Sequence, residues 1–205
     1  MSPRAYDKRL RQAASEEAKR RIIQATAGLH AERGSRGTSH AMIAERAGVS
    51  VPTVYKYFPT AEDLIPACTG LVTSRAPVVL DERLFEGLHG LPERVRALAD
   101  ALFRLHEYFA PWSRWTPGDA AESPALREYV QRVQEHQVRM IRLALTPKGG
   151  KAPPERLVEL ARILLDLNSW RTLTESTHST SRSAAVAAEA VLSIHRSYPF
   201  SKEKP

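Results

Sequence analysis

The segment Thr53–Tyr57 gathers three hydroxyl groups and one cation within five residues. If it is helical, Val54 shares a face with Phe58 four residues later, and that face belongs to a core. Thr53, Tyr55, Lys56 and Tyr57 are then left to make polar contacts. Hydroxyl and ammonium groups donate hydrogen bonds to phosphate oxygens and to base edges. The segment therefore predicts a helix that touches nucleic acid.

Patterns typical of enzymes are missing from the sequence. No two of the seven histidines have the His-x-x-x-His spacing of a metal site on one helical face. There is no Gly-x-Ser-x-Gly elbow and no dinucleotide fingerprint. The single cysteine, Cys68, allows neither an intramolecular disulfide nor a thiolate cluster, and its apolar surroundings predict an inert, partly buried thiol. We expect no catalytic residue, no metal and no cofactor.

Two short helices around a tight turn are predicted to position the polar segment. The first runs over about 39–47, with Ile43 on its apolar face, and Gly48 supplies the corner that needs a positive φ. Ser50 caps the second helix, and Pro52 is tolerated in its first turn. This pattern is a helix-turn-helix, in which the second helix enters a DNA major groove. His40 is interpreted as a solvated residue of the first turn.

The motif also carries a specific family resemblance. It reads Thr38-Ser39-x-x-x-Ile43-Ala44-x-x-Ala47-Gly48-Val49-Ser50, and then Thr53-Val54-Tyr55-Lys56-Tyr57-Phe58-Pro59-Thr60-x-Glu62-Asp63-Leu64. Over roughly residues 16–65 the chain resembles the TetR family of bacterial transcriptional regulators. The resemblance implies a homodimeric repressor of a double-stranded DNA operator, released when its C-terminal domain binds a small molecule. It implies operator contacts from Thr38, Thr53, Tyr55, Lys56 and Tyr57.

Two positions depart from the family pattern. Pro52 stands where glycine is frequent, and Ala61 stands where a lysine often reaches a phosphate. Both changes suggest that the second helix of the motif and the start of the helix after it make fewer contacts with the DNA backbone. The N-terminus offers compensation, because residues 1–21 carry seven basic and three acidic side chains in a chain of net charge +7.

The remaining sequence predicts helices throughout and no strands. Expected helices cover 92–109, 124–145, 154–177 and 183–197, after a joint at about 76–91. The expected fold is all-α, an N-terminal three-helix helix-turn-helix domain followed by a C-terminal helical bundle. The expected domains are a basic flexible arm at 1–14, a DNA-binding domain at 15–60 and a ligand-binding and dimerisation domain at 61–205. No segment reaches the roughly 18 apolar residues of a membrane span, and no secretory signal is evident, so we expect a cytoplasmic protein without a membrane partner.

Three polar residues interrupt apolar stripes of the larger domain: His106, Gln137 and Asn168. Each has a plain interpretation as a satisfied core residue. Together they are compatible with a pocket for a lipophilic effector, with Trp112 and Trp115 at its mouth.

The last predicted helices are apolar over a broad surface, which favours a subunit interface that includes Leu164, Ala184, Ala188 and Val191. Two further functions stay open at this point. One is a ligand-independent architectural DNA-binding protein, and the other is an activator of the same fold.

Overall fold

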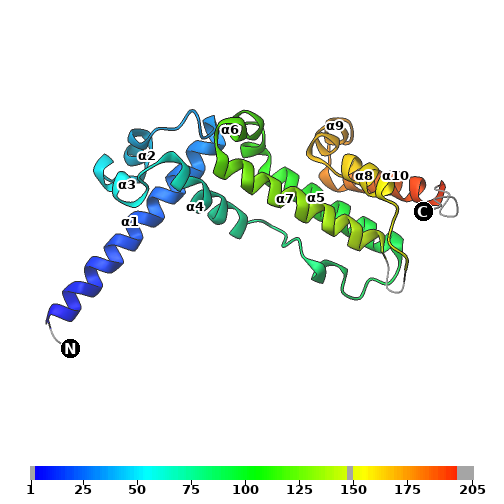
Figure 1. Ribbon diagram of the computed structural model, residues 1–205, viewed down its shortest axis with the longest axis horizontal. Coiled ribbons are helices and arrows are strands. Elements are labelled where there is room, and N and C mark those ends of the chain that lie inside the picture. Colours follow the sequence, from blue (N-terminus) through cyan, green and yellow to red (C-terminus); the bar gives the residue numbers. More distant parts are fainter. Residues whose placement is uncertain (1–2, 147–149, 198–205) are drawn as a thin grey trace. The chain divides into compact units, whose positions relative to one another are not determined.

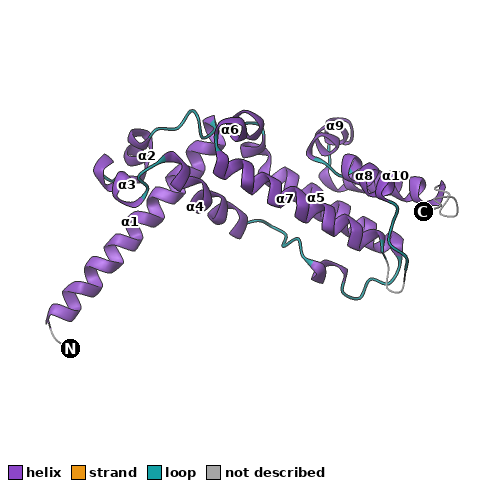
Figure 2. Ribbon diagram, viewed as in Figure 1, coloured by secondary structure: helices purple, strands orange, loops and turns teal. Residues whose placement is uncertain are grey.

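The computed structural model describes residues 3–146 and 150–197 of the chain (Figure 1). Within these ranges every regular element is a helix and there is no strand, so the all-α prediction is confirmed (Figure 2). The elements are α1 (Pro3–Arg33), α2 (His40–Ala47), α3 (Val51–Tyr57), α4 (Ala61–Ser74), η1 (Glu82–Phe85), α5 (Leu91–Ser113), α6 (Thr116–Glu122), α7 (Pro124–Leu145), α8 (Glu155–Leu164), α9 (Leu167–Thr177) and α10 (Thr180–Ser197). None of the described helices is long and apolar enough to cross a membrane.

The chain divides into two compact units. The first unit comprises residues 1–75 and 111–130, and the second comprises residues 76–110 and 131–205. The expected boundary at residue 60 therefore lies inside the first unit. The physical reason is α4, whose Leu64 is buried in the same apolar cluster as Ile22 of α1 and Val54 of α3.

The N-terminal segment differs from the expected arm. Helix α1 begins at Pro3 and continues without a break to Arg33, so residues 3–14 are helical, while residues 1 and 2 lie outside the described part. Proline is compatible with the first position of a helix, and the run through Ala13 and Ala14 contains no glycine that would weaken the helix.

Helices α1 to α4 of the first unit enclose a small apolar core. Val54 and Phe58 are both buried in it, as their shared face predicted. The start of α4 is fixed by a capping box in which Thr60 and Asp63 bond to each other's backbone N–H groups. The short helices α2 and α3 are therefore held on a scaffold of two longer ones.

The second unit has its own core, which α5, α7, α8 and α10 share. Its sequence predicted one helix over 154–177, but the structure has two. Asp166 interrupts the run, because its carboxylate accepts a hydrogen bond of 2.7 Å from the backbone N–H of Ser169 and so caps a new helix, α9. Helices α5 and α7 each contribute residues to both units.

Candidate nucleic-acid interface

The corner between α2 and α3 has the geometry of a tight turn. Gly48 has φ = 63°, a conformation that strains any residue with a Cβ. The backbone N–H of Val49 donates to the Ala44 carbonyl at 3.0 Å, which closes the end of α2. Ser50 then caps α3, since its hydroxyl accepts from the Thr53 N–H at 3.3 Å. The predicted helix-turn-helix is present, with α3 as its second helix.

Helix α3 turns Val54 into the core and presents an opposite face to solvent. Tyr55 is 51% exposed, and Lys56 is exposed beside it. The Lys56 ammonium lies 5.4 Å from the centroid of the Tyr57 ring, in cation–π contact with it. Val51 is also exposed, which the sequence analysis did not single out. The sequence could have indicated Val51 as a contact residue, because it is the first residue of the predicted second helix. Its exposed methyl groups are suited to contact with a thymine methyl.

The other three predicted contact residues already have partners within the protein. The Tyr57 hydroxyl bonds to Ser15 Oγ of α1 at 2.6 Å. The Thr53 hydroxyl bonds to Ser50 Oγ at 2.7 Å, and the Thr38 hydroxyl donates to the Gly34 carbonyl at 2.8 Å. These hydroxyls hold the motif together, which leaves Tyr55 and Lys56 as the polar side chains most available to a ligand.

His40 is not the solvated residue that the sequence suggested. It is half-buried, and its Nε2 lies 2.9 Å from the Phe58 carbonyl at the end of α3. Its ring stacks on the Tyr55 ring with centroids 4.3 Å apart and an interplanar angle of 6°. The first residue of α2 therefore contacts both the exposed tyrosine and the C-terminal end of α3.

The same region is where the chain resembles known proteins. Residues 22–68 match the family described as bacterial regulatory proteins, tetR family, a match that includes the whole helix-turn-helix. The HTH-type transcriptional regulator LuxR of Vibrio harveyi is 26% identical over 149 residues, which cover 69% of this chain and 72% of that protein. The helix-turn-helix region of the chain is therefore similar to that of tetR-family regulators.

Solved structures extend the likeness to the fold beyond the matched region. A transcriptional regulator from Streptomyces coelicolor A3(2) has a TM-score of 0.63 at 23% identity, covering 87% of this chain and 98% of the other. One from Rhodococcus sp. Rha1 has a TM-score of 0.62 at 21% identity, with coverages of 85% and 95%. The likeness of fold therefore extends beyond residues 22–68 to most of the chain.

The two tryptophans predicted at a pocket mouth lie in the first unit. The Trp112 indole N–H donates to the Ala27 carbonyl of α1 at 2.9 Å, and that of Trp115 donates to the Ala31 carbonyl at 3.1 Å. Two partly buried hydrogen bonds therefore attach the end of α5 to the backbone of α1, and both indole N–H groups are used within the protein.

Helix α6 makes a second attachment to α1, centred on a buried carboxylate. Asp119 accepts a hydrogen bond of 2.6 Å from the Ser35 N–H and one of 3.5 Å from the Arg36 N–H. Gly34 precedes them with φ = 76°, and a Cβ there would lie 2.8 Å from an Asp119 oxygen. This contact closes the C-terminal end of α1 against α6.

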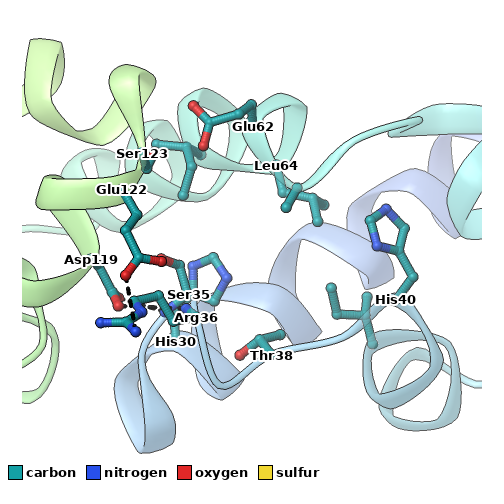
Figure 3. A pocket seen from close by; sticks show the side chains of 13 residues that line it. His30, Ser35, Arg36, Thr38, His40, Glu62, Leu64, Asp119, Glu122 and Ser123 are labelled. Atoms are coloured by element: carbon teal, nitrogen blue, oxygen red, sulfur yellow. Dashed lines mark hydrogen bonds and ion pairs between the residues drawn. The ribbon is translucent and has the colours of Figure 1, made fainter.

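A cavity of about 170 Å³ lies beside this carboxylate within the first unit (Figure 3). Its wall combines aliphatic side chains such as Ile43 and Leu64 with polar ones, among them Arg36, which pairs with Glu122 at 2.9 Å. Thr38 and His40 line it on the side of α2 (Figure 3). Burial lowers the pKa of His30, another wall residue, to about 4, against a smaller opposing effect of Asp119.

The three polar residues of the sequence analysis belong to the second unit, whereas the two tryptophans belong to the first. His106 is buried, and its Nε2 bonds to the Leu165 carbonyl at 2.9 Å, while burial lowers its pKa. Gln137 is half-buried and Asn168 is exposed. Asn168 departs from its expected core position because α9 starts afresh after Asp166 and turns a different face inward.

The predicted subunit interface needs a correction. Ala184, Ala188 and Val191 are buried in the core of the single chain, at 3%, 0% and 2% exposure, so they cannot touch a second copy in this structure. Leu164 is partly buried against the same core. The helices α8 and α10 pack on each other, and their outward apolar residues are Ile163 and Val186, at 51% and 49% exposure. A broadly apolar sequence did not reveal which face is inward.

Proposed function

We propose that this protein is a repressor that binds a double-stranded DNA operator through α3 and has no enzymatic activity. The observation that carries the proposal is the solvent-facing side of α3, where Tyr55 and Lys56 are presented by a capped helix-turn-helix. Lys56 supplies a phosphate contact, which fixes position, and Tyr55 and Val51 face the base edges. Thr38, Thr53 and Tyr57 act mainly through the hydrogen bonds that hold this motif in shape.

The operator is near-palindromic and the regulator binds it as a homodimer. One helix-turn-helix touches too few base pairs to select a site among genomic competitors, whereas two related by two-fold symmetry read paired half-sites. The outward residues Ile163 and Val186 support a contact between two copies through α8 and α10. They take the place of Ala184, Ala188 and Val191 as the residues that meet the partner.

A small lipophilic effector binds the second unit and releases the DNA. The support is the continuity of α5, which supplies Leu102 and Phe103 to the second core and Trp112 to the first unit. A ligand that shifts α5 changes how the end of this helix holds α1. The expected coupling is about 1–3 kcal/mol, and operator DNA weakens effector binding by the same factor. His106, Gln137 and Asn168 remain the predicted effector contacts.

A reporter experiment tests the repressor role. DNA fragments that the wild-type protein selects from its genome are placed upstream of a reporter gene, in cells with and without the protein. The proposal predicts that reporter transcript falls when wild-type protein is present and recovers with Lys56→Ala. Transcript that rises with the wild-type protein identifies an activator instead, and transcript that is unchanged despite binding identifies an architectural protein.

A further inference from the structure

The His40 side chain joins two parts of the helix-turn-helix that differ in exposure. Its Nε2 lies 2.9 Å from the Phe58 carbonyl, so this nitrogen carries the proton and donates. Its ring lies face to face with Tyr55, with a centroid separation of 4.3 Å and planes 6° apart. The hydrogen bond fixes the imidazole plane, and the imidazole plane in turn supports the tyrosine ring.

Tyr55 needs such support because half of its surface faces solvent. A tyrosine on an exposed helix face samples several χ1 rotamers, and freezing them on binding costs free energy. Among the described residues, no protein group bonds to the Tyr55 hydroxyl, whereas the Tyr57 hydroxyl is bonded to Ser15. Tyr55 is therefore the aromatic hydroxyl of α3 that is presented outward, and its ring is held from below by His40.

We propose that His40 is a positioning residue for DNA binding, which holds Tyr55 in the rotamer that contacts the operator. This inference rests on the proposed function, since it concerns how α3 meets DNA. His40 acts through Tyr55 and makes no DNA contact of its own. The stack is the part that matters for binding, and the hydrogen bond to Phe58 keeps the imidazole in place for it.

A double-mutant cycle separates this role from general support of the fold. The probe is the duplex of about 30 base pairs that wild-type protein enriches most from a pool with a randomised centre, long enough for two half-sites. His40→Ala is expected to weaken binding roughly 3- to 10-fold, the range that an aromatic pair supplies. In a Tyr55→Leu background, the same His40→Ala change is expected to have almost no further effect.

Two conservative variants distinguish support of the Tyr55 ring from general support of the fold. His40→Phe keeps a flat ring against Tyr55 and loses the donor, so it is expected to retain most of the affinity. His40→Asn keeps a donor and loses the ring, so it is expected to behave like His40→Ala. The Tyr55 ring protons, shifted by the stacked imidazole in NMR spectra of the free protein, are expected to move in His40→Ala. His89→Ala, which removes an exposed histidine of the second unit, is the matched control.

Distinct outcomes overturn the inference and the proposed function. Additive losses for His40→Ala and Tyr55→Leu, or full affinity in His40→Asn with loss in His40→Phe, overturn the positioning role while operator binding stands. Failure of the wild-type protein to enrich any duplex overturns both. If thermal unfolding shows that His40→Ala is not folded, the comparison of His40→Phe with His40→Asn decides the matter.

Discussion

At the scale of single residues, the face of α3 divides into groups that hold the motif and groups that are free to bind. Tyr57, Thr53 and Thr38 are tied to neighbouring oxygens, whereas Lys56 and Tyr55 are exposed. The sequence grouped all five together, because residue type alone does not reveal whether a hydroxyl already has a partner. Its assignment of Val54 and Phe58 to the core is confirmed, since that follows from helical spacing.

The Lys56 ammonium is expected to contribute mainly electrostatic binding. Lys56→Ala should weaken binding to selected and unrelated duplexes by similar factors, because phosphates are alike in every sequence. It should also reduce the slope of log affinity against log salt by about one unit. Fluorescence anisotropy at several salt concentrations measures both quantities. If the slope were unchanged in Lys56→Ala, Lys56 would not contact a phosphate.

Buried His30 is expected to make the first unit sensitive to acid. Burial lowers the pKa of His30 from 6.5 to about 4. Between these pH values His30 is therefore protonated in the unfolded chain and neutral in the folded one. The free energy of unfolding therefore falls as pH decreases from about 6.5 to 4, by about 3 kcal/mol at most from this residue. Burial also lowers the pKa of His106, so this residue too reduces the free energy of unfolding as the pH decreases.

Urea unfolding at several pH values checks this expectation. His30→Gln should flatten the dependence of stability on pH within this window, since it removes the group that titrates. His89→Gln, at an exposed site, should leave the dependence as in the wild type. An identical pH dependence in wild type and His30→Gln would contradict the buried, neutral His30.

At the scale of elements, most helices were predictable and their ends and inward faces were not. The helix over 124–145 was predicted with the bounds that α7 has. The break at Asp166 was missed, because an aspartate can cap a helix or simply sit on its surface. The inward face of α10 was missed as well, since alanine and valine lie on several of its sides. Its orientation is set by its packing against α8 and α9, which residue type alone does not reveal.

The contact between Asp119 and the end of α1 is expected to stabilise the first unit. Asp119→Ala leaves the Ser35 N–H without its acceptor in a partly buried site, so the free energy of unfolding should drop by about 1–3 kcal/mol. Asp119→Asn keeps an acceptor oxygen and should lose less. Chemical denaturation followed by circular dichroism provides the values.

Glu122→Ala is the matched control on the same helix. Its ion pair with Arg36 joins two side chains more than half exposed, so its removal should change stability by less than about 1 kcal/mol. Equal losses for Asp119→Ala and Glu122→Ala would mean that the carboxylate does not act through the backbone of α1.

At the scale of the whole molecule, the account requires two copies on one operator. Val186→Glu and Ile163→Glu place a charge on the outward faces of α10 and α8. Each should give folded monomers that still melt cooperatively, at a temperature below that of the wild-type dimer because association no longer stabilises the fold. Ala188→Glu buries a charge in the core of the single chain and should unfold it instead. Sedimentation velocity with thermal melting distinguishes these results. Dimers that persist in both surface variants would place the interface elsewhere.

The most direct test of sequence-specific DNA binding through α3 is a selection from a random duplex pool by the wild-type protein and by a Tyr55→Leu/Lys56→Ala double variant. We predict that the wild type enriches one site with two inverted half-sites, centred about one helical turn or a multiple of it apart. The double variant, folded as judged by circular dichroism, should enrich no site. A wild type that enriches nothing, or a double variant that enriches the same site, would contradict the account.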